Sequence, residues 1–177
     1  MPFQAPADGV LLPPYRILDL TGPEGVFCGK LLADYGADVV KIEPPGGDAA
    51  RQRPPFIGDQ PGPERSSYFL FYNTNKKSVT LDLESPQGQD LFKKMTATAD
   101  VVIESFSVGY MKSLGLDFDS LKTANPGLVM ASITPFGQTG PWKDYKSSDL
   151  ISLAASGFMQ ITGDPDGPPM RQGNEQS

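Results

Sequence analysis

The stretch RILDLTGPEGVFCGKLLADYGADVVKIE, residues 16–43, decides the fold. An apolar run opens it and ends at the turn of residues 21–23. Apolar side chains then recur at helical spacing over residues 26–35, and Gly36 supplies a C-terminal stop. A second apolar run follows at residues 37–43. A strand, a helix and a strand within about 30 residues form a βαβ unit, so the two strands should be parallel.

The same alternation continues along the chain. We expect further strands at residues 77–83, 99–104 and 128–133, the last of them buried, and helices at residues 86–98, 149–155, near Met111 and near Leu121. Ser85 and Asp149 are the expected N-caps of the two longer helices. Residues 48–67 form a loop too long for an ordinary connection. The pattern predicts an α/β fold with a Rossmann-like parallel sheet flanked by helices.

Composition excludes several kinds of function. The chain has 177 residues, no histidine and one cysteine, Cys28, so it can form neither a histidine-based triad nor an internal disulfide nor a cysteine-rich zinc site. We therefore expect no metal held by histidine or cysteine, and we assign no metal ligands and no permanently bound cofactor to the chain. The net charge of -6 is opposite to that of nucleic-acid-binding domains.

The chain also lacks the marks of export. Residues 1–14 have no signal-peptide pattern, and prolines interrupt the longest uncharged stretch, residues 123–142. We expect a cytoplasmic protein with neither a membrane nor a nucleic acid as partner.

Ligands of parallel α/β sheets bind at the carboxyl ends of the strands. The turn at residues 22–25 opens a helix whose N-terminus could receive a phosphate. Glu43 ends the second strand, where dinucleotide-binding folds place the acid that binds the ribose. The glycine fingerprint of those folds is missing, so a nicotinamide-dependent oxidoreductase is only an alternative.

Several segments, in order, carry a family resemblance: RILDLT at residues 16–21, LLADYGADVVKIEPPGGD at 31–48, NKKSVTLDL at 75–83, ADVVIESF at 99–106, SITPFGQTGP at 132–141 and TGDPDGPP at 162–169. They resemble family III CoA-transferases, the group of formyl-CoA and carnitine CoA-transferases and 2-methylacyl-CoA racemases. The resemblance implies a large Rossmann-like domain, a smaller second domain and an interlocked dimer. Residues 1–177 would then be the amino-terminal part of the large CoA-binding domain, with the second domain and the chain end absent.

The resemblance also implies the binding residues for coenzyme A, which enters as CoA or acyl-CoA substrate. Pro23 and Glu24 would line its entrance, and Pro44 would lie beside the adenine. The groove would be formed by Leu81, Leu83, Ser105, Phe106 and Ser107. Tyr145, Lys146 and Ser148 would approach the phosphate or pantetheine end. Some relatives carry basic residues where Pro44 and Ser113 stand, so this chain offers the nucleotide fewer cations.

The implied reaction moves CoA between an acyl-CoA and a carboxylic acid. An aspartate attacks the thioester and forms a mixed anhydride, which needs no histidine. Its position falls immediately after Ser177, so we expect no catalytic residue within residues 1–177. Ser148 stands where racemases have a histidine, which disfavours the racemase reaction.

The expected partners are an acyl-CoA, a carboxylic acid and a second subunit, in a homodimer or a heterodimer with a homologous chain. Residues 173–177, GNEQS, differ from the small-residue lead-in of active chains. A non-catalytic subunit of a heteromeric CoA-transferase is therefore a further alternative.

Overall fold

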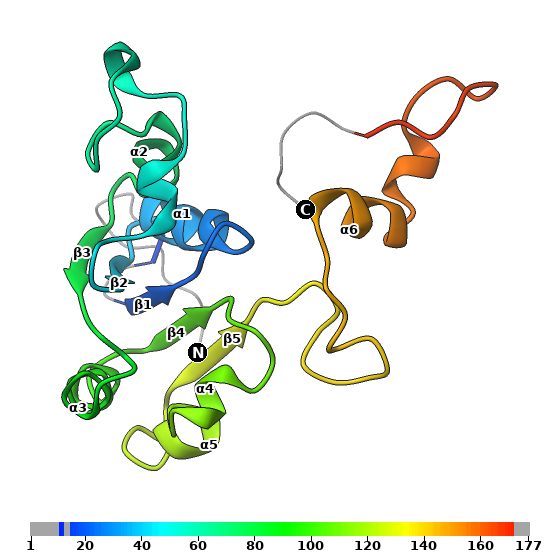
Figure 1. The fold of residues 1–177 in the computed structure, drawn as a ribbon. Coiled ribbons are helices and arrows are strands. Elements are labelled where there is room, and N and C mark those ends of the chain that lie inside the picture. The colour runs from blue at the N-terminus through cyan, green and yellow to red at the C-terminus, as the bar shows by residue number, and fades with distance from the viewer. Residues whose placement is uncertain (1–10, 13–14, 172–177) are drawn as a thin grey trace. The chain divides into compact units, whose positions relative to one another are not determined.

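The structure is a computed structural model and describes residues 11, 12 and 15–171 (Figure 1). Within these residues, five parallel strands pair in the order β3-β2-β1-β4-β5. The strands are β1 (Arg16–Leu20), β2 (Asp38–Glu43), β3 (Lys77–Thr80), β4 (Val101–Glu104) and β5 (Val129–Ser132). The chain runs outward from β1 to β3 and then crosses to β4, so the strand order reverses between β1 and β4. The predicted Rossmann-like α/β fold is confirmed.

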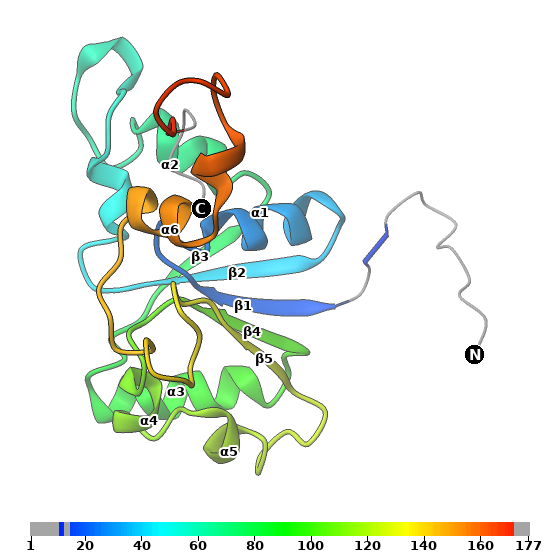
Figure 2. The ribbon, with the colours of Figure 1, turned by 90° about the vertical axis from the view of Figure 1, so that its right-hand side faces the viewer.

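Helices cover both faces of this sheet. The α-helices are α1 (Val26–Asp34), α2 (Ser67–Tyr72), α3 (Pro86–Thr96), α4 (Tyr110–Ser113), α5 (Phe118–Leu121) and α6 (Asp149–Ala155), and the short 3-10 helices are η1 (Ala49–Gln52), η2 (Ile57–Asp59) and η3 (Phe158–Ile161). Figure 2 shows α1 and α2 over one face, with α3, α4 and α5 over the other. The βαβ pattern of the sequence therefore produces a three-layer arrangement.

The central strand β1 divides the core into two clusters. Because side chains alternate along a strand, Leu18 and Leu20 face one side of the sheet and Ile17 faces the other. Leu18 and Leu20 pack with Phe92 of α3, which is 0% exposed. Ile17 packs with Ala33 of α1 in the second cluster. Both layers of helices are thus held by apolar contacts with the same strand.

Two details of the prediction are wrong. Residues 128–133 were expected to form a buried strand, but β5 lies at the sheet edge and Val129 is 58% exposed. Asp149 was expected to cap its helix, but it is the first helical residue. Ser148 is the N-cap, and its Oγ accepts a hydrogen bond from the Ile151 amide at 3.4 Å.

The long segment of residues 48–67 has more structure than the sequence indicated. It holds η1 and η2 and leads directly into α2, which sequence reasoning missed. Ser66 explains this order, because its buried Oγ caps α2 by accepting from the Phe69 amide at 3.1 Å. The same hydroxyl also reaches the carbonyls of Ala50 and Arg53, at 2.9 and 2.5 Å. One side chain therefore ties the start of α2 to η1.

The chain divides into two compact units, residues 1–133 and 134–177. The sheet and the helices α1 to α5 belong to the first unit. In the second unit, Phe136 packs edge to face against Trp142 and Tyr145, and Arg171 pairs with Asp149 of α6 at 3.0 Å. Among the residues that the structure describes, no helix has the length and apolar character needed to cross a bilayer.

Gly88 marks a close approach that leaves no room for a side chain. A Cβ at this position in α3 would lie 1.7 Å from the carbonyl oxygen of Asp82. We expect Gly88→Ala to lower the free energy of unfolding by about 3 kcal/mol, because the added methyl group overpacks the contact. Urea denaturation of the complete protein would measure this. Gly127→Ala is the control, because its Cβ would meet only Asn125 Oδ1 at 3.6 Å. Equal losses in both variants would contradict the prediction.

Candidate functional site

A cavity of about 310 Å³ lies at the carboxyl ends of the strands in the first unit. Its lining residues are Leu20, Ile42, Glu43, Pro44, Pro45, Leu81, Asp82, Leu83, Glu84, Phe106 and Tyr110. They come from the ends of β1 and β2, from the segments that follow β2, β3 and β4, and from α4. This is the edge of a parallel sheet at which ligands bind.

The cavity has apolar walls and one aromatic side. Leu20, Ile42 and Leu81 are buried core residues that reach the cavity at the strand ends. The ring of Phe106 packs against Tyr110, with centroids 4.7 Å apart. The turn that carries Phe106 is fixed by buried Glu104, whose Oε2 accepts from the Phe106 amide at 2.7 Å. A flat, apolar group would therefore meet a preformed surface.

The mouth of the cavity is acidic. Asp82 and Glu84 are exposed residues, and Asp82 Oδ1 accepts from the Glu84 amide at 3.0 Å. The Tyr110 hydroxyl donates to Glu84 Oε1 at 3.3 Å. Burial and then the charge of Glu84 raise the pKa of Tyr110 above its usual value, so the phenol stays protonated as a donor. The position of the Glu84 carboxylate is thus set by its own turn and by α4.

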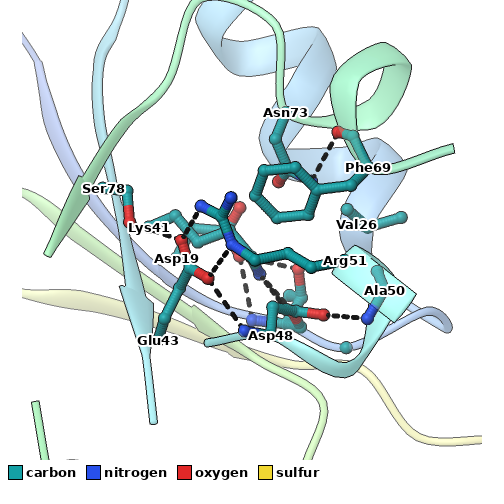
Figure 3. A network of polar contacts seen from close by, with 12 residues as sticks. Asp19, Val26, Lys41, Glu43, Asp48, Ala50, Arg51, Phe69, Asn73 and Ser78 are labelled. Carbon is teal, nitrogen blue, oxygen red and sulfur yellow. Dashed lines mark hydrogen bonds and ion pairs between the residues drawn. The ribbon is translucent and has the colours of Figure 1, made fainter. Parts of the chain in front are cut away.

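Glu43 also lines this cavity and is 2% exposed. Figure 3 shows the polar contacts around its carboxylate. Arg51 binds it with two hydrogen bonds of 2.7 Å, and Ser78 Oγ and the Asp48 amide also donate to it. Burial alone would raise the pKa of Glu43, but these donors outweigh burial and lower it to about 2. Arg51 also stacks on the Phe69 ring, 3.8 Å from its centroid.

Two more buried ion pairs lie beside this one. Lys41 Nζ contacts Asp48 Oδ2 at 2.8 Å and donates to the Thr21 carbonyl at 2.8 Å. Lys76 Nζ contacts Asp19 Oδ2 at 2.8 Å. Burial lowers the pKa of Lys76 more than Asp19 restores it. In each pair the cation is held by a carboxylate of the chain itself.

The structure brings together four of the residues that the resemblance places at coenzyme A: Pro44, Leu81, Leu83 and Phe106 line the cavity. Ser105 does not line it, but its Oγ accepts from the Gly22 amide at 2.7 Å and joins the turns after β1 and β4. Pro23, Glu24 and Ser107 are exposed residues outside the cavity lining.

The other three predicted residues belong to the second unit. Tyr145 is 63% exposed and lies against Phe136, Ser148 caps α6, and Lys146 is exposed. Sequence reasoning missed six lining residues, Leu20, Ile42, Pro45, Asp82, Glu84 and Tyr110, and it considered Glu43 only for the nicotinamide alternative. Leu20 and Ile42, at the strand ends, could have been found from the rule that ligands meet the carboxyl ends. Tyr110 and Glu84 are 26 residues apart and meet only in the fold.

The model of CoA-transferase family III matches residues 12–176, nearly the whole chain. The chain belongs to CoA-transferase family III. It is 47% identical over 152 residues to succinate–glutarate CoA-transferase of Agrobacterium fabrum, covering 84% of this chain and 38% of that protein. It is 39% identical over 163 residues to subunit BbsE of succinyl-CoA:(R)-benzylsuccinate CoA-transferase of Thauera aromatica, covering 92% and 40%.

Solved structures agree with this assignment. A CaiB/BaiF family protein from Brucella suis matches with a TM-score of 0.83 and 39% identity, over 92% of this chain and 43% of that one. The predicted membership in the family is therefore confirmed. The chain spans about two fifths of the length of the curated relatives it matches.

Membership in CoA-transferase family III argues against the alternative of a nicotinamide-dependent oxidoreductase. The contacts of Glu43 argue against it as well. A ribose-binding acid must offer free carboxylate oxygens to the cofactor. Both oxygens of Glu43 are occupied by Arg51, and one also accepts from Ser78. Glu43 thus holds Arg51 and Ser78 in this chain.

The low pKa of Glu43 predicts a specific dependence of stability on pH. The folded pKa of about 2 lies below the ordinary 4.5, so the ion pair contributes fully above about pH 4.5 and is lost as the pH falls toward 2. As the pH falls over this interval, the unsubstituted protein should lose about 3 kcal/mol more of its free energy of unfolding than Glu43→Gln does. Urea denaturation between pH 2 and 6 measures it.

The control for this experiment is Glu64→Gln. Glu64 pairs with the same Arg51 at 2.6 Å, but its side chain is 75% exposed, so its contribution is screened by solvent. We expect this variant to keep the pH dependence of the unsubstituted protein. Identical pH slopes in Glu43→Gln and the unsubstituted protein would show that the buried pair is not responsible.

Proposed function

We propose that the complete protein is a CoA-transferase that moves CoA between an acyl-CoA and a carboxylic acid. The observation that carries this proposal is the apolar cavity at the carboxyl ends of β1 and β2, flanked by Phe106 and Tyr110. It lies where the family resemblance places the adenine end of coenzyme A. The single cysteine fits a reducing compartment such as the cytoplasm.

The cavity suits a nucleobase. Phe106 offers a ring face that is already held by Tyr110, and base–aromatic stacking contributes about 1–3 kcal/mol per base. Pro44, Leu81 and Leu83 supply apolar contacts around it. Acyl-CoA is thus proposed as a substrate that is held by its nucleotide end, with no permanently bound cofactor.

The names of the relatives support a role in binding the common part of their substrates. One is named for glutarate and the other for benzylsuccinate, yet this segment is 47% and 39% identical to them. A segment shared by enzymes for different acids is expected to serve what those reactions have in common, which is coenzyme A. We therefore propose that the choice of acid depends mainly on other parts of the complete protein.

Replacing Phe106 tests the nucleotide site. We expect Phe106→Ala to raise the KM for acyl-CoA by about 5- to 100-fold with little change in kcat, because a stacking contact worth about 1–3 kcal/mol is made equally in the ground and transition states. Phe118→Ala is the control, because Phe118 is an exposed aromatic residue of α5 outside the cavity. Steady-state rates with succinyl-CoA and a panel of carboxylic acids measure both. An unchanged KM in Phe106→Ala would contradict the site.

The chemistry is proposed to belong to an aspartate directly after Ser177. Its carboxylate attacks the thioester carbonyl carbon, the C–S bond breaks, and CoA leaves as the thiolate while a mixed anhydride forms. The thiolate and the acceptor acid then exchange through enzyme-bound anhydride and thioester intermediates. Residues 172–177 lie outside the described residues.

We expect the gene to encode aspartate at the position after Ser177, and its replacement by asparagine to abolish transfer while CoA still binds. The specific alternative is a non-catalytic subunit, which the subunit name of the Thauera aromatica relative favours. Sequencing of the gene and assay of the complete protein purified alone separate the two proposals. Transfer by that protein alone would eliminate the alternative. A different residue at this position, with activity only after addition of a homologous subunit, would favour it.

A further inference from the structure

The cavity that we propose for the nucleotide end of coenzyme A carries negative charge at its mouth. Asp82 and Glu84 are exposed, both line the cavity, and neither forms an ion pair with a cation of the described residues. Both charges act on Tyr110, the third residue of the mouth, whose pKa they help to raise after burial. The mouth therefore carries two negatively charged carboxylates.

Each of these carboxylates accepts one hydrogen bond at the mouth. Asp82 is held by two contacts to the start of α3: its Oδ1 accepts from the Glu84 amide at 3.0 Å, and its carbonyl accepts from Ser85 Oγ at 2.9 Å. Ser85 in turn caps α3 by accepting from the Gly88 amide. Glu84 is fixed by Tyr110 at 3.3 Å. These contacts favour the positions of both carboxylates at the mouth.

Nearby cations are engaged elsewhere. Arg51 is bound to Glu43, and Lys41 to Asp48, both inside the first unit. Lys112 is an exposed residue close to Tyr110 in sequence, but it does not line the cavity. The described part of the first unit thus presents carboxylates, and not ammonium or guanidinium groups, at the cavity mouth.

We infer that this acidic mouth disfavours the 3′-phosphate of coenzyme A, so that the protein binds dephospho-coenzyme A at least as tightly as coenzyme A. The inference rests on the proposed function, because the cavity must receive the adenosine end. Two like charges near one another repel, and the repulsion weakens as salt is added. The adenine itself is neutral, and its amino group is a donor that suits the Glu84 carboxylate. The site therefore recognises the base and not the phosphate on the ribose.

Direct titration of the complete protein with coenzyme A and with dephospho-coenzyme A tests this inference. The expected result is a Kd for dephospho-coenzyme A equal to or up to about fivefold lower than that for coenzyme A at low ionic strength, with the difference reduced at high salt. A Kd for coenzyme A that is lower than that for the dephospho form by more than the experimental error would overturn the inference and leave the proposed function standing. Binding of neither compound would overturn both.

Two variants assign the effect to Glu84. Glu84→Gln keeps an acceptor oxygen for Tyr110 and removes the charge, so we expect it to improve coenzyme A binding about three- to fivefold relative to dephospho-coenzyme A binding. Asp90→Asn is the matched control, because Asp90 is an exposed carboxylate of α3 that does not line the cavity. If Glu84→Gln changed the Kd of both compounds equally, or if Asp90→Asn gave the same selective gain, the charge at the mouth would not be the cause of the preference.

Discussion

The arrangement of the first unit depends on the pairing of buried charges beside β1 and β2. Asp19, next to the last residue of the central strand β1, is 0% exposed, and an unpaired buried carboxylate would cost several kcal/mol. Its partner Lys76 follows α2, far along the chain. Asp48 and Arg51, from the start of the long segment after β2, pair with Lys41 and Glu43 in the same way. Satisfying three buried pairs therefore fixes residues 48–76 on the sheet and explains why this segment is ordered.

This constraint also shapes the site. The fold has the strand order and the terminal acid of a dinucleotide-binding sheet, but Glu43 is turned into a ligand of Arg51 and cannot serve a ribose. The cations that form these internal ion pairs are not available to a ligand at the strand ends. What remains exposed there is an apolar wall with Phe106 and an acidic mouth. The same interactions that hold the fold together thus decide which charged groups line the cavity.

The sequence predicts most of the fold because strands, helices and caps such as Ser85 are local patterns. It failed for α2, whose run SYFLFY has no helical periodicity and is capped by Ser66, a residue also bound to distant carbonyls. It failed for the burial of β5, because an apolar run does not show whether a neighbouring strand covers it. Four cavity residues came from the family resemblance, whereas the mouth depends on contacts between segments distant in sequence.

Two glycines outside the cavity lining show that helix packing also sets the geometry of the site. A Cβ on Gly29 of α1 would lie 2.2 Å from Asp19 Oδ2, and one on Gly88 of α3 would lie 1.7 Å from the Asp82 carbonyl. Only glycine allows these helices so close to the charged network and to the cavity mouth. Neither Gly29 nor Gly88 lines the cavity. The geometry of the site thus depends partly on residues outside the cavity lining, because close backbone packing sets where the carboxylates lie.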